Sequence, residues 1–433
     1  MLTHYYDKVT TKPKSFKMNS VCDSERIIGN VQKSFTTEDN MISLLHTPDG
    51  VRDLYGEELT QKKQLLKSIN NTIKLYGFEM LDTPAFEYFD VFSKDIGTIP
   101  SKDLYKFFDK EGNTLVLRPD FTPSVARCAA KYFPDETLPL RFCYEGNTFV
   151  NTSELQGKLK ETTEIGVELI NDDSIYADAE VLRLVIESLR NVGMKDFQIS
   201  IGESNYFKGI CEEAKLDEET EMTLRDYISS KNFYGSRQFL SSLEIDDKVL
   251  GAIESISEVY LPVKDLKELL GKTTNERSKN AISRLIKINS LLALSGYERY
   301  VTYDLSMLSK YHYYTGIIFS AYTYGVGNPI VKGGRYDGLL EKFGKKAPSV
   351  GCVFKIDEIQ TALRRTGLKT EEKEPVKKAV VYTEENYEKA LHSAEELRAQ
   401  GSSVLLILRD GNTSQYEYEK MLQSQNCEVL FYD

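Results

Sequence analysis

Two strand-like segments that follow one another without a helix between them are the strongest constraint on this fold. Residues Leu140 to Phe149 alternate enough between apolar and polar side chains to indicate a strand. A polar loop follows, and Gly166 to Ile170 begins a partner strand. The sequence therefore predicts an antiparallel pair, and such pairs usually have one face open to solvent or to a ligand.

Helical and strand patterns continue on both sides of this pair. Leu65, Ile69 and Ile73 recur at helical spacing, and Gly77 lies where a helix often ends. A second helix is predicted over 177–189, and the stretch 205–296 is a mostly helical insertion. Further strands are predicted over 78–81, 115–117, 197–201, 300–303 and 316–320.

The length of 433 residues suggests two or three domains. Residues 1–40 show no apolar period, which predicts a disordered extension, a start codon placed too early (with Met41 as the true start) or a partner-binding arm. The core is expected over 41–365 and a charged linker over 366–378. Over 379–433 strands alternate with helices, which predicts a small α/β domain with parallel strands.

Charge and composition exclude several classes of function. The chain has 55 Lys and Arg against 66 Asp and Glu, a net charge of −11, which argues against non-specific nucleic-acid binding. The sequence contains no run of about 18 apolar residues, so no membrane-spanning helix is predicted. The six cysteines and four histidines are scattered, so no metal site or cofactor is predicted. The start lacks an apolar signal-peptide segment, and we expect a cytoplasmic protein.

Six motifs occur in one order and together carry a family resemblance. They are Thr47-Pro-Asp-Gly-Val-Arg-Asp53, Leu117-Arg-Pro-Asp-Phe-Thr122, Arg141-Phe-Cys-Tyr-Glu-Gly146, Ala177-Asp-Ala-Glu180, Tyr313-Tyr-Thr315 and Gly333-Gly-Arg-Tyr-Asp337. The chain resembles a class II histidyl-tRNA synthetase core over about 44–363. The resemblance implies an α+β fold, an antiparallel six-stranded sheet flanked by helices that dimerises around Pro84. The C-terminal domain resembles a shortened anticodon-binding domain.

The chain departs from synthetases where they hold ATP. By resemblance, three arginines contact the phosphates, and the matching positions here are Val150, Ser309 and Glu358. Charge that builds on phosphoryl oxygens needs such cations, so adenylation is not expected and no residue is predicted to be catalytic. The neighbouring Lys158, Lys160 and Lys310 could compensate only in part, because lysine lacks the bidentate fork of arginine.

The amino-acid half of the pocket is retained. By resemblance, Asp120 and Thr122 lie near the α-amino group of histidine, and Tyr313, Tyr314 and Tyr336 form an aromatic and hydroxyl wall. Glu164 and Glu168 are four residues apart on a strand, so they point to one face, where carboxylates suit an ammonium group and an imidazole N–H. Alternatively, these acids are ordinary surface or dimer-contact residues. The predicted histidine-binding residues are Asp120, Thr122, Glu164, Glu168, Tyr313, Tyr314 and Tyr336.

Other conspicuous residues have structural interpretations. Arg335 is expected to form a structural ion pair, and Gly325 with Gly327 to form a turn. Gly333 and Gly334 are expected to let a ligand approach the backbone.

A synthetase core that keeps histidine recognition and loses the phosphate cations resembles the regulatory-subunit family of ATP phosphoribosyltransferase (the HisZ family). The segments Tyr311 to Phe319 and Leu117 to Arg127 are closer to that family than to synthetases. The resemblance implies a non-catalytic subunit that activates a short-form catalytic subunit at the first step of histidine biosynthesis. It also implies feedback inhibition by histidine, a hetero-octamer and no tRNA partner.

Two other functions remain open. One is a divergent histidyl-tRNA synthetase that forms histidyl-adenylate with lysines in place of arginines. It would need a basic surface for tRNA and would catalyse histidine-dependent exchange of pyrophosphate into ATP. The other is a histidine-sensing adaptor for a different partner.

Overall fold

The structure is a computed structural model that describes residues 45–93, 99–152, 158–243, 245, 247–256, 261–308, 314–367, 377–423 and 427–433. The chain divides into two units, Met1–Arg52 and Asp53–Asp433. In the described part of the first unit, the Thr47 hydroxyl donates to the Val51 carbonyl and closes a turn. The predicted disordered extension, 1–40, lies outside the described residues.

The centre of the second unit is one mixed sheet of eight strands in the order β1-β5-β6-β11-β10-β9-β7-β8. Its inner six strands are antiparallel, whereas β1 runs parallel to β5 and β8 parallel to β7. The expected six antiparallel strands are thus confirmed, and two short parallel strands extend the sheet at its edges. The strands are β1 (Glu79–Met80), β5 (Leu140–Phe149), β6 (Glu161–Ile170), β7 (Phe197–Glu203), β8 (Val301–Tyr303), β9 (Ile317–Thr323), β10 (Val331–Arg335) and β11 (Ser349–Lys355).

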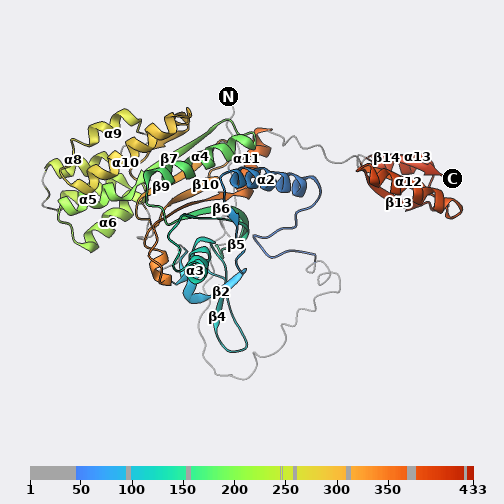
Figure 1. The fold of residues 1–433 in the computed structure, drawn as a ribbon, viewed down its shortest axis with the longest axis horizontal. Coiled ribbons are helices and arrows are strands. Elements are labelled where there is room, and N and C mark those ends of the chain that lie inside the picture. Colours follow the sequence, from blue (N-terminus) through green and yellow to red (C-terminus); the bar gives the residue numbers. More distant parts are fainter. Residues whose placement is uncertain are drawn as a thin grey trace, which may run out of the picture. The chain divides into compact units, whose positions relative to one another are not determined.

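Different helices pack against the two faces of the sheet, as Figure 1 shows. Helices α2 (Gly56–Leu75), α4 (Ile175–Asn191) and α11 (Ile356–Thr366) lie on one face, and α3 (Thr122–Tyr132) lies on the other. On β6, Ile165, Val167 and Leu169 belong to the core beneath the three helices. Because side chains alternate along a strand, the even-numbered residues of β6 point to the α3 side.

The helix α2 buries the apolar residues that recur at helical spacing in its sequence. Leu65, Ile69 and Ile73 form one buried stripe, and Gly77 adopts a φ of 75° just after the helix, a conformation that glycine accepts without strain. The short loop after it leads into β1 and then into a separate three-stranded antiparallel sheet. That sheet consists of β2 (Phe86–Tyr88), β4 (Thr114–Leu117) and β3 (Lys106–Phe108).

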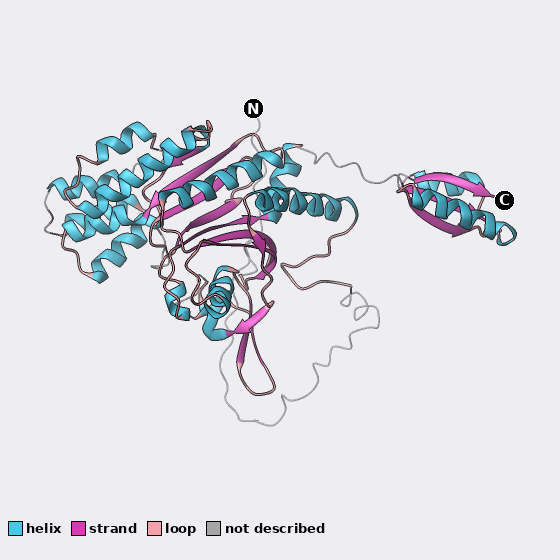
Figure 2. Ribbon diagram, in the orientation of Figure 1, coloured by secondary structure: helices cyan, strands magenta, loops and turns pink. Residues whose placement is uncertain are grey.

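The remaining elements fall into a helical group and a small α/β group, which Figure 2 distinguishes by colour. The helices α5 (Ser204–Glu213), α6 (Glu218–Ser229), α7 (Phe233–Ser241), α8 (Asp247–Ser255), α9 (Val263–Leu269) and α10 (Glu276–Ala293) lie between β7 and β8 in the sequence. The C-terminal elements are β12 (Lys377–Tyr382), α12 (Tyr387–Ala399), β13 (Ser403–Leu408), α13 (Gln415–Gln423) and β14 (Cys427–Tyr432), with parallel strands in the order β13-β12-β14.

Within the described residues, no helix is both long enough and apolar enough to cross a membrane.

Candidate functional site

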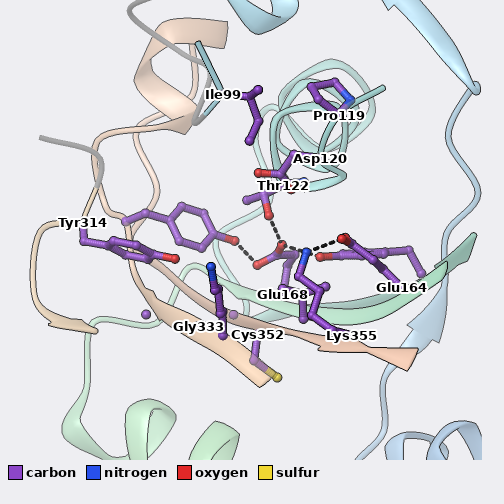
Figure 3. Close-up of a pocket in the computed structure, with 16 residues that line it drawn as sticks. Ile99, Pro119, Asp120, Thr122, Glu164, Glu168, Tyr314, Gly333, Cys352 and Lys355 are labelled. Carbon is purple, nitrogen blue, oxygen red and sulfur yellow. Dashed lines mark hydrogen bonds and ion pairs between the residues drawn. The ribbon is translucent and has the colours of Figure 1, made fainter. Parts of the chain in front are cut away.

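A cavity of about 360 Å³ opens on the α3 side of the main sheet. The strands β6, β11 and β10 form its floor, and the start of α3 with the preceding turn forms one wall (Figure 3). Its lining residues are Ile99, Pro119, Asp120, Thr122, Tyr144, Glu164, Glu168, Tyr314, Lys332, Gly333, Gly334, Tyr336, Gly351, Cys352, Val353 and Lys355.

Strand register explains why these residues meet. Glu164 pairs with Lys355 and Glu168 pairs with Gly351 across β6 and β11. On the next strand, Lys332 pairs with Val353 and Gly334 with Gly351. Alternation then places the side chains of Glu164, Glu168, Lys355, Lys332 and Tyr336 on the same face of three neighbouring strands.

Glu168 is the buried acid at the centre of the cavity. Its carboxylate accepts hydrogen bonds from the Thr122 hydroxyl at 2.8 Å, from the Tyr144 hydroxyl at 3.4 Å and from the Tyr336 hydroxyl. Burial raises the pKa of Glu168 to about 8, because these three donors are uncharged and only partly offset its desolvation. Near neutral pH this carboxyl is therefore close to its own pKa, and a ligand cation or N–H donor would shift it towards the carboxylate.

Glu164 has a different partner. It forms an ion pair with the Lys355 ammonium and accepts a hydrogen bond from the Thr148 hydroxyl at 3.1 Å (Figure 3). Burial raises the pKa of Glu164, while the positive charge of Lys355 opposes that rise. The same pair raises the pKa of Lys355 despite its own desolvation.

Glycines in the floor leave room for these side chains. A Cβ on Gly351 would lie 1.8 Å from Glu168 Oε2, and a Cβ on Gly166 would lie 2.2 Å from the Tyr144 ring. A Cβ on Gly334 would lie 2.6 Å from the Tyr314 ring, and one on Gly333 would meet the Phe319 ring. Gly333 and Gly334 thus accommodate the protein's own aromatic rings, and because both also line the cavity, the approach of a ligand to their backbone stays a prediction.

The cavity brings together six of the seven side chains predicted to bind histidine: Asp120, Thr122, Glu164, Glu168, Tyr314 and Tyr336. The seventh, Tyr313, lies outside the described residues. Their role in binding histidine stays a prediction. The sequence interpretation missed Lys332, Lys355 and Tyr144 as cavity residues. The only signal for Lys332 was its spacing of four from Tyr336 on one strand, which places both on one face.

The positions matched to the lost arginines do not line this cavity where the structure describes them. The Val150 amide donates to the Lys160 carbonyl, and Glu358 accepts a hydrogen bond from the Asn328 amide at 2.8 Å. Ser309 and Lys310 lie outside the described residues. Arg335 forms ion pairs with Asp178 and Asp337, which confirms the structural ion pair predicted for it.

Comparison with known proteins gives concordant matches. The family model described as histidyl-tRNA synthetase matches residues 50–359. The ATP phosphoribosyltransferase regulatory subunit of Ruminiclostridium cellulolyticum is 37% identical over 360 residues, 83% of this chain and 86% of that protein. The protein of that name from Acetivibrio thermocellus is 38% identical over 368 residues, 85% and 88% of the two chains.

A solved structure agrees with these relatives. The crystal structure of an ATP phosphoribosyltransferase regulatory subunit/histidyl-tRNA synthetase from Bacillus halodurans has a TM-score of 0.80 and 30% identity, covering 90% of this chain and 98% of that one. Fold and cavity thus define the class as that of histidyl-tRNA synthetase-like proteins. Sequence identity of 37–38% over most of both chains assigns this chain to one family within that class. The chain belongs to the family of ATP phosphoribosyltransferase regulatory subunits.

Proposed function

We propose that this chain is a regulatory subunit that activates a short-form ATP phosphoribosyltransferase and makes it sensitive to histidine, without catalysing a reaction itself. Its curated relatives carry the regulatory-subunit name. The observation that supports the proposal is the cavity, which contains a buried acid cluster suited to histidine.

Two features of the described residues argue against adenylate formation. Valine and glutamate, Val150 and Glu358, stand where the resemblance places phosphate-binding arginines. In addition, Lys355 extends into the cavity and is held by Glu164, so its charge is already neutralised. Loss of one oxyanion-stabilising donor commonly costs about 2.7–4 kcal/mol in the transition state, and the loss of two or more would leave little activity.

The acid cluster suits histidine as the effector. The carboxylates of Asp120 and Glu168 can accept hydrogen bonds from an α-ammonium group and an imidazole N–H, and the Tyr314 and Tyr336 rings provide an apolar wall. For feedback inhibition, histidine must bind the inhibited state of the complex more tightly than the active state. The coupling to the catalytic subunit is therefore the difference in histidine affinity between the active and the inhibited state of the assembly.

The assembly that we propose contains a dimer of this chain, within a hetero-octamer of four regulatory and four catalytic subunits. The β2-β4-β3 sheet supports the dimer, because it exposes the aromatic side chains of Phe86, Tyr88 and Phe108. Exposed apolar patches of this kind often mark protein interfaces. A net charge of −11 is unfavourable for binding tRNA, so we propose no tRNA partner.

The test combines this chain with a short-form ATP phosphoribosyltransferase from the same source. Formation of phosphoribosyl-ATP is followed with each chain alone, with both, and with both plus histidine. We expect the rate to rise when the two chains are mixed and to fall as histidine is added. We expect this chain alone to give no histidine-dependent exchange of pyrophosphate into ATP.

Two variants connect the inhibition to the cavity. Glu168→Gln should raise the histidine concentration that halves the rate by about tenfold or more, because it removes a buried charged acceptor. The exposed Glu111→Gln, which makes the same chemical change outside the cavity, should be inhibited like the unaltered chain. An unchanged rate on mixing, without co-migration on a sizing column, would contradict the proposal and favour a synthetase or another adaptor.

A further inference from the structure

The cavity carries charges of both signs in an ordered arrangement. The Asp120 and Glu168 carboxyl groups lie at the α3 side, where Thr122 contacts both residues. The ammonium groups of Lys355 and Lys332 come from β11 and β10, and Lys332 pairs with Val353, two residues from Lys355 on the same face of the floor. A ligand in this cavity would therefore meet Asp120 and Glu168 on the α3 side, and the two lysines together with Glu164 elsewhere on the floor.

The two lysines are not equivalent. Lys355 forms an ion pair with Glu164, which is almost completely buried, so their charges cancel. Lys332 has neither a hydrogen bond nor an ion pair within the described part of the chain, although it lines the cavity. Partial burial and the neighbouring charge of Lys355 lower the pKa of Lys332, whereas the charges of Glu164 and Asp120 oppose that shift. Lys332 is exposed at the mouth of the cavity, where a ligand can reach its ammonium.

An ammonium group held without a partner in a cavity favours an anionic group of a ligand. A carboxylate fits best, because it carries one negative charge and Lys332 offers one uncompensated positive charge. A triphosphate carries several charges, and the described cavity residues offer no further uncompensated cation. Neutralisation of Glu164 by Lys355 removes the repulsion that a bound carboxylate would otherwise meet there.

We propose that Lys332 binds the α-carboxylate of the amino acid in this cavity and thereby distinguishes the free amino acid from derivatives that lack the acid. This inference rests on the proposed function, which makes histidine the ligand. The Lys355–Glu164 pair neutralises the charge of Glu164 near Lys332, so that Glu164 does not repel the bound carboxylate. The opposite end of the cavity, with Asp120 and Glu168, receives the ammonium and imidazole groups.

The test compares two ligands on matched variants by isothermal titration calorimetry with the full chain. Histidine and histidinol share the ammonium and imidazole groups, but histidinol has a hydroxymethyl group in place of the carboxylate. The unaltered chain should bind histidine about ten- to a hundredfold more tightly than histidinol, the range expected for one charged hydrogen bond. Lys332→Met should bring this ratio close to one by weakening histidine alone, and Lys332→Arg should retain most of it.

Lys158→Met is the matched control, because Lys158 influences Lys332 electrostatically without lining the cavity. It should leave the affinity ratio unchanged. Histidine binding with an unchanged ratio in Lys332→Met would overturn this inference and leave the proposed function intact. Failure of the unaltered chain to bind histidine would instead overturn histidine as effector, and the assignment of Lys332 with it.

Discussion

Glu168 shows how a single residue can be costly for folding and useful for binding. Its carboxyl is buried on β6 and surrounded by the hydroxyl groups of Thr122, Tyr144 and Tyr336, and none of its hydrogen-bond partners among the described residues is a cation. Three neutral donors do not replace the hydration that an ionised carboxylate loses on burial. A positively charged or N–H-bearing group of a ligand would therefore stabilise the ionised form of this acid.

A pH dependence of stability follows from this burial. The pKa of Glu168 is about 8 in the folded chain and about 4.5 when exposed, so between these values the folded state holds a proton that the unfolded state releases. The free energy of unfolding should fall as pH rises from about 5 to 8. Without histidine, Glu168→Gln should reduce that fall by roughly 2–5 kcal/mol, measured by urea unfolding at several pH values.

Some pH dependence should remain in that variant, because burial also raises the pKa of Glu203 to about 7. Glu111→Gln serves as control, since Glu111 is exposed, and it should keep the full slope. A slope in Glu168→Gln equal to that of the unaltered chain would show that Glu168 ionises normally in the fold.

Sequence reasoning at the residue scale succeeded for the acids and failed for the lysines. Glu164 and Glu168 could be placed on one face because their spacing of four is independent of neighbouring strands. Lys332 has the appearance of an ordinary solvated strand residue, and only the register of β10 with β11 and β6 shows that it lines the cavity. The register of β11 with β6 depends on contacts between segments more than 100 residues apart, which no local pattern contains.

At the scale of elements, one buried acid joins three of them. Asp178 on α4 forms ion pairs with Arg335 on β10 at 2.7 Å and with Arg284 on α10 at 2.5 Å. The Asp178 and Arg335 side chains are almost fully buried. Because Tyr336 follows Arg335 and hydrogen-bonds Glu168, this cluster also fixes the strand that forms the cavity floor.

Removal of the shared acid should be strongly destabilising. Asp178→Ala leaves the buried Arg335 guanidinium with the more exposed Asp337 as its remaining ion-pair partner, and loss of one partner of a buried pair typically costs about 3–5 kcal/mol. Urea unfolding should measure this loss. The exposed pair Arg237–Glu254 provides the comparison, and Arg237→Ala should cost less than about 1 kcal/mol. Equal losses in the two variants would show that burial does not determine the contribution of the Asp178 cluster.

The elements themselves were largely predictable, with the edges as exceptions. The limits predicted for β5 agree with the structure, and the predicted helix over 177–189 corresponds to α4 (Ile175–Asn191). Long segments carry enough residues for their period to be recognised. The edge strands β1 and β8 lie within the strands predicted over 78–81 and 300–303, but with two and three residues they contain no signal for the sheet that they join or for their parallel pairing. These two strands extend the expected antiparallel sheet of six strands to one of eight.

At the scale of the whole molecule, the β2-β4-β3 sheet presents an apolar surface that this single chain leaves uncovered. Phe86 and Phe108 are 52% and 72% exposed. The Phe86 and Phe107 rings contact each other edge to face, with 5.8 Å between the ring centroids. Single exposed aromatic residues are common, but several on one small sheet are not explained by folding of the monomer. A second copy of the chain is the occupant that the class II resemblance implies.

The dimer can be tested without disturbing the core. The double variant Phe86→Asp with Phe108→Asp places two charges on the proposed interface, where burial against a partner copy would be unfavourable. Both side chains are largely exposed in the monomer, so the fold should survive, as circular dichroism would show. Light scattering on a sizing column should give a dimer for the unaltered chain and a monomer for the double variant.

Tyr324→Asp is the control, because Tyr324 is an exposed aromatic residue outside that sheet, and this variant should stay dimeric. A monomeric unaltered chain, or a double variant that remains dimeric, would place the contact elsewhere, and the hetero-octamer would then need a different symmetric interface.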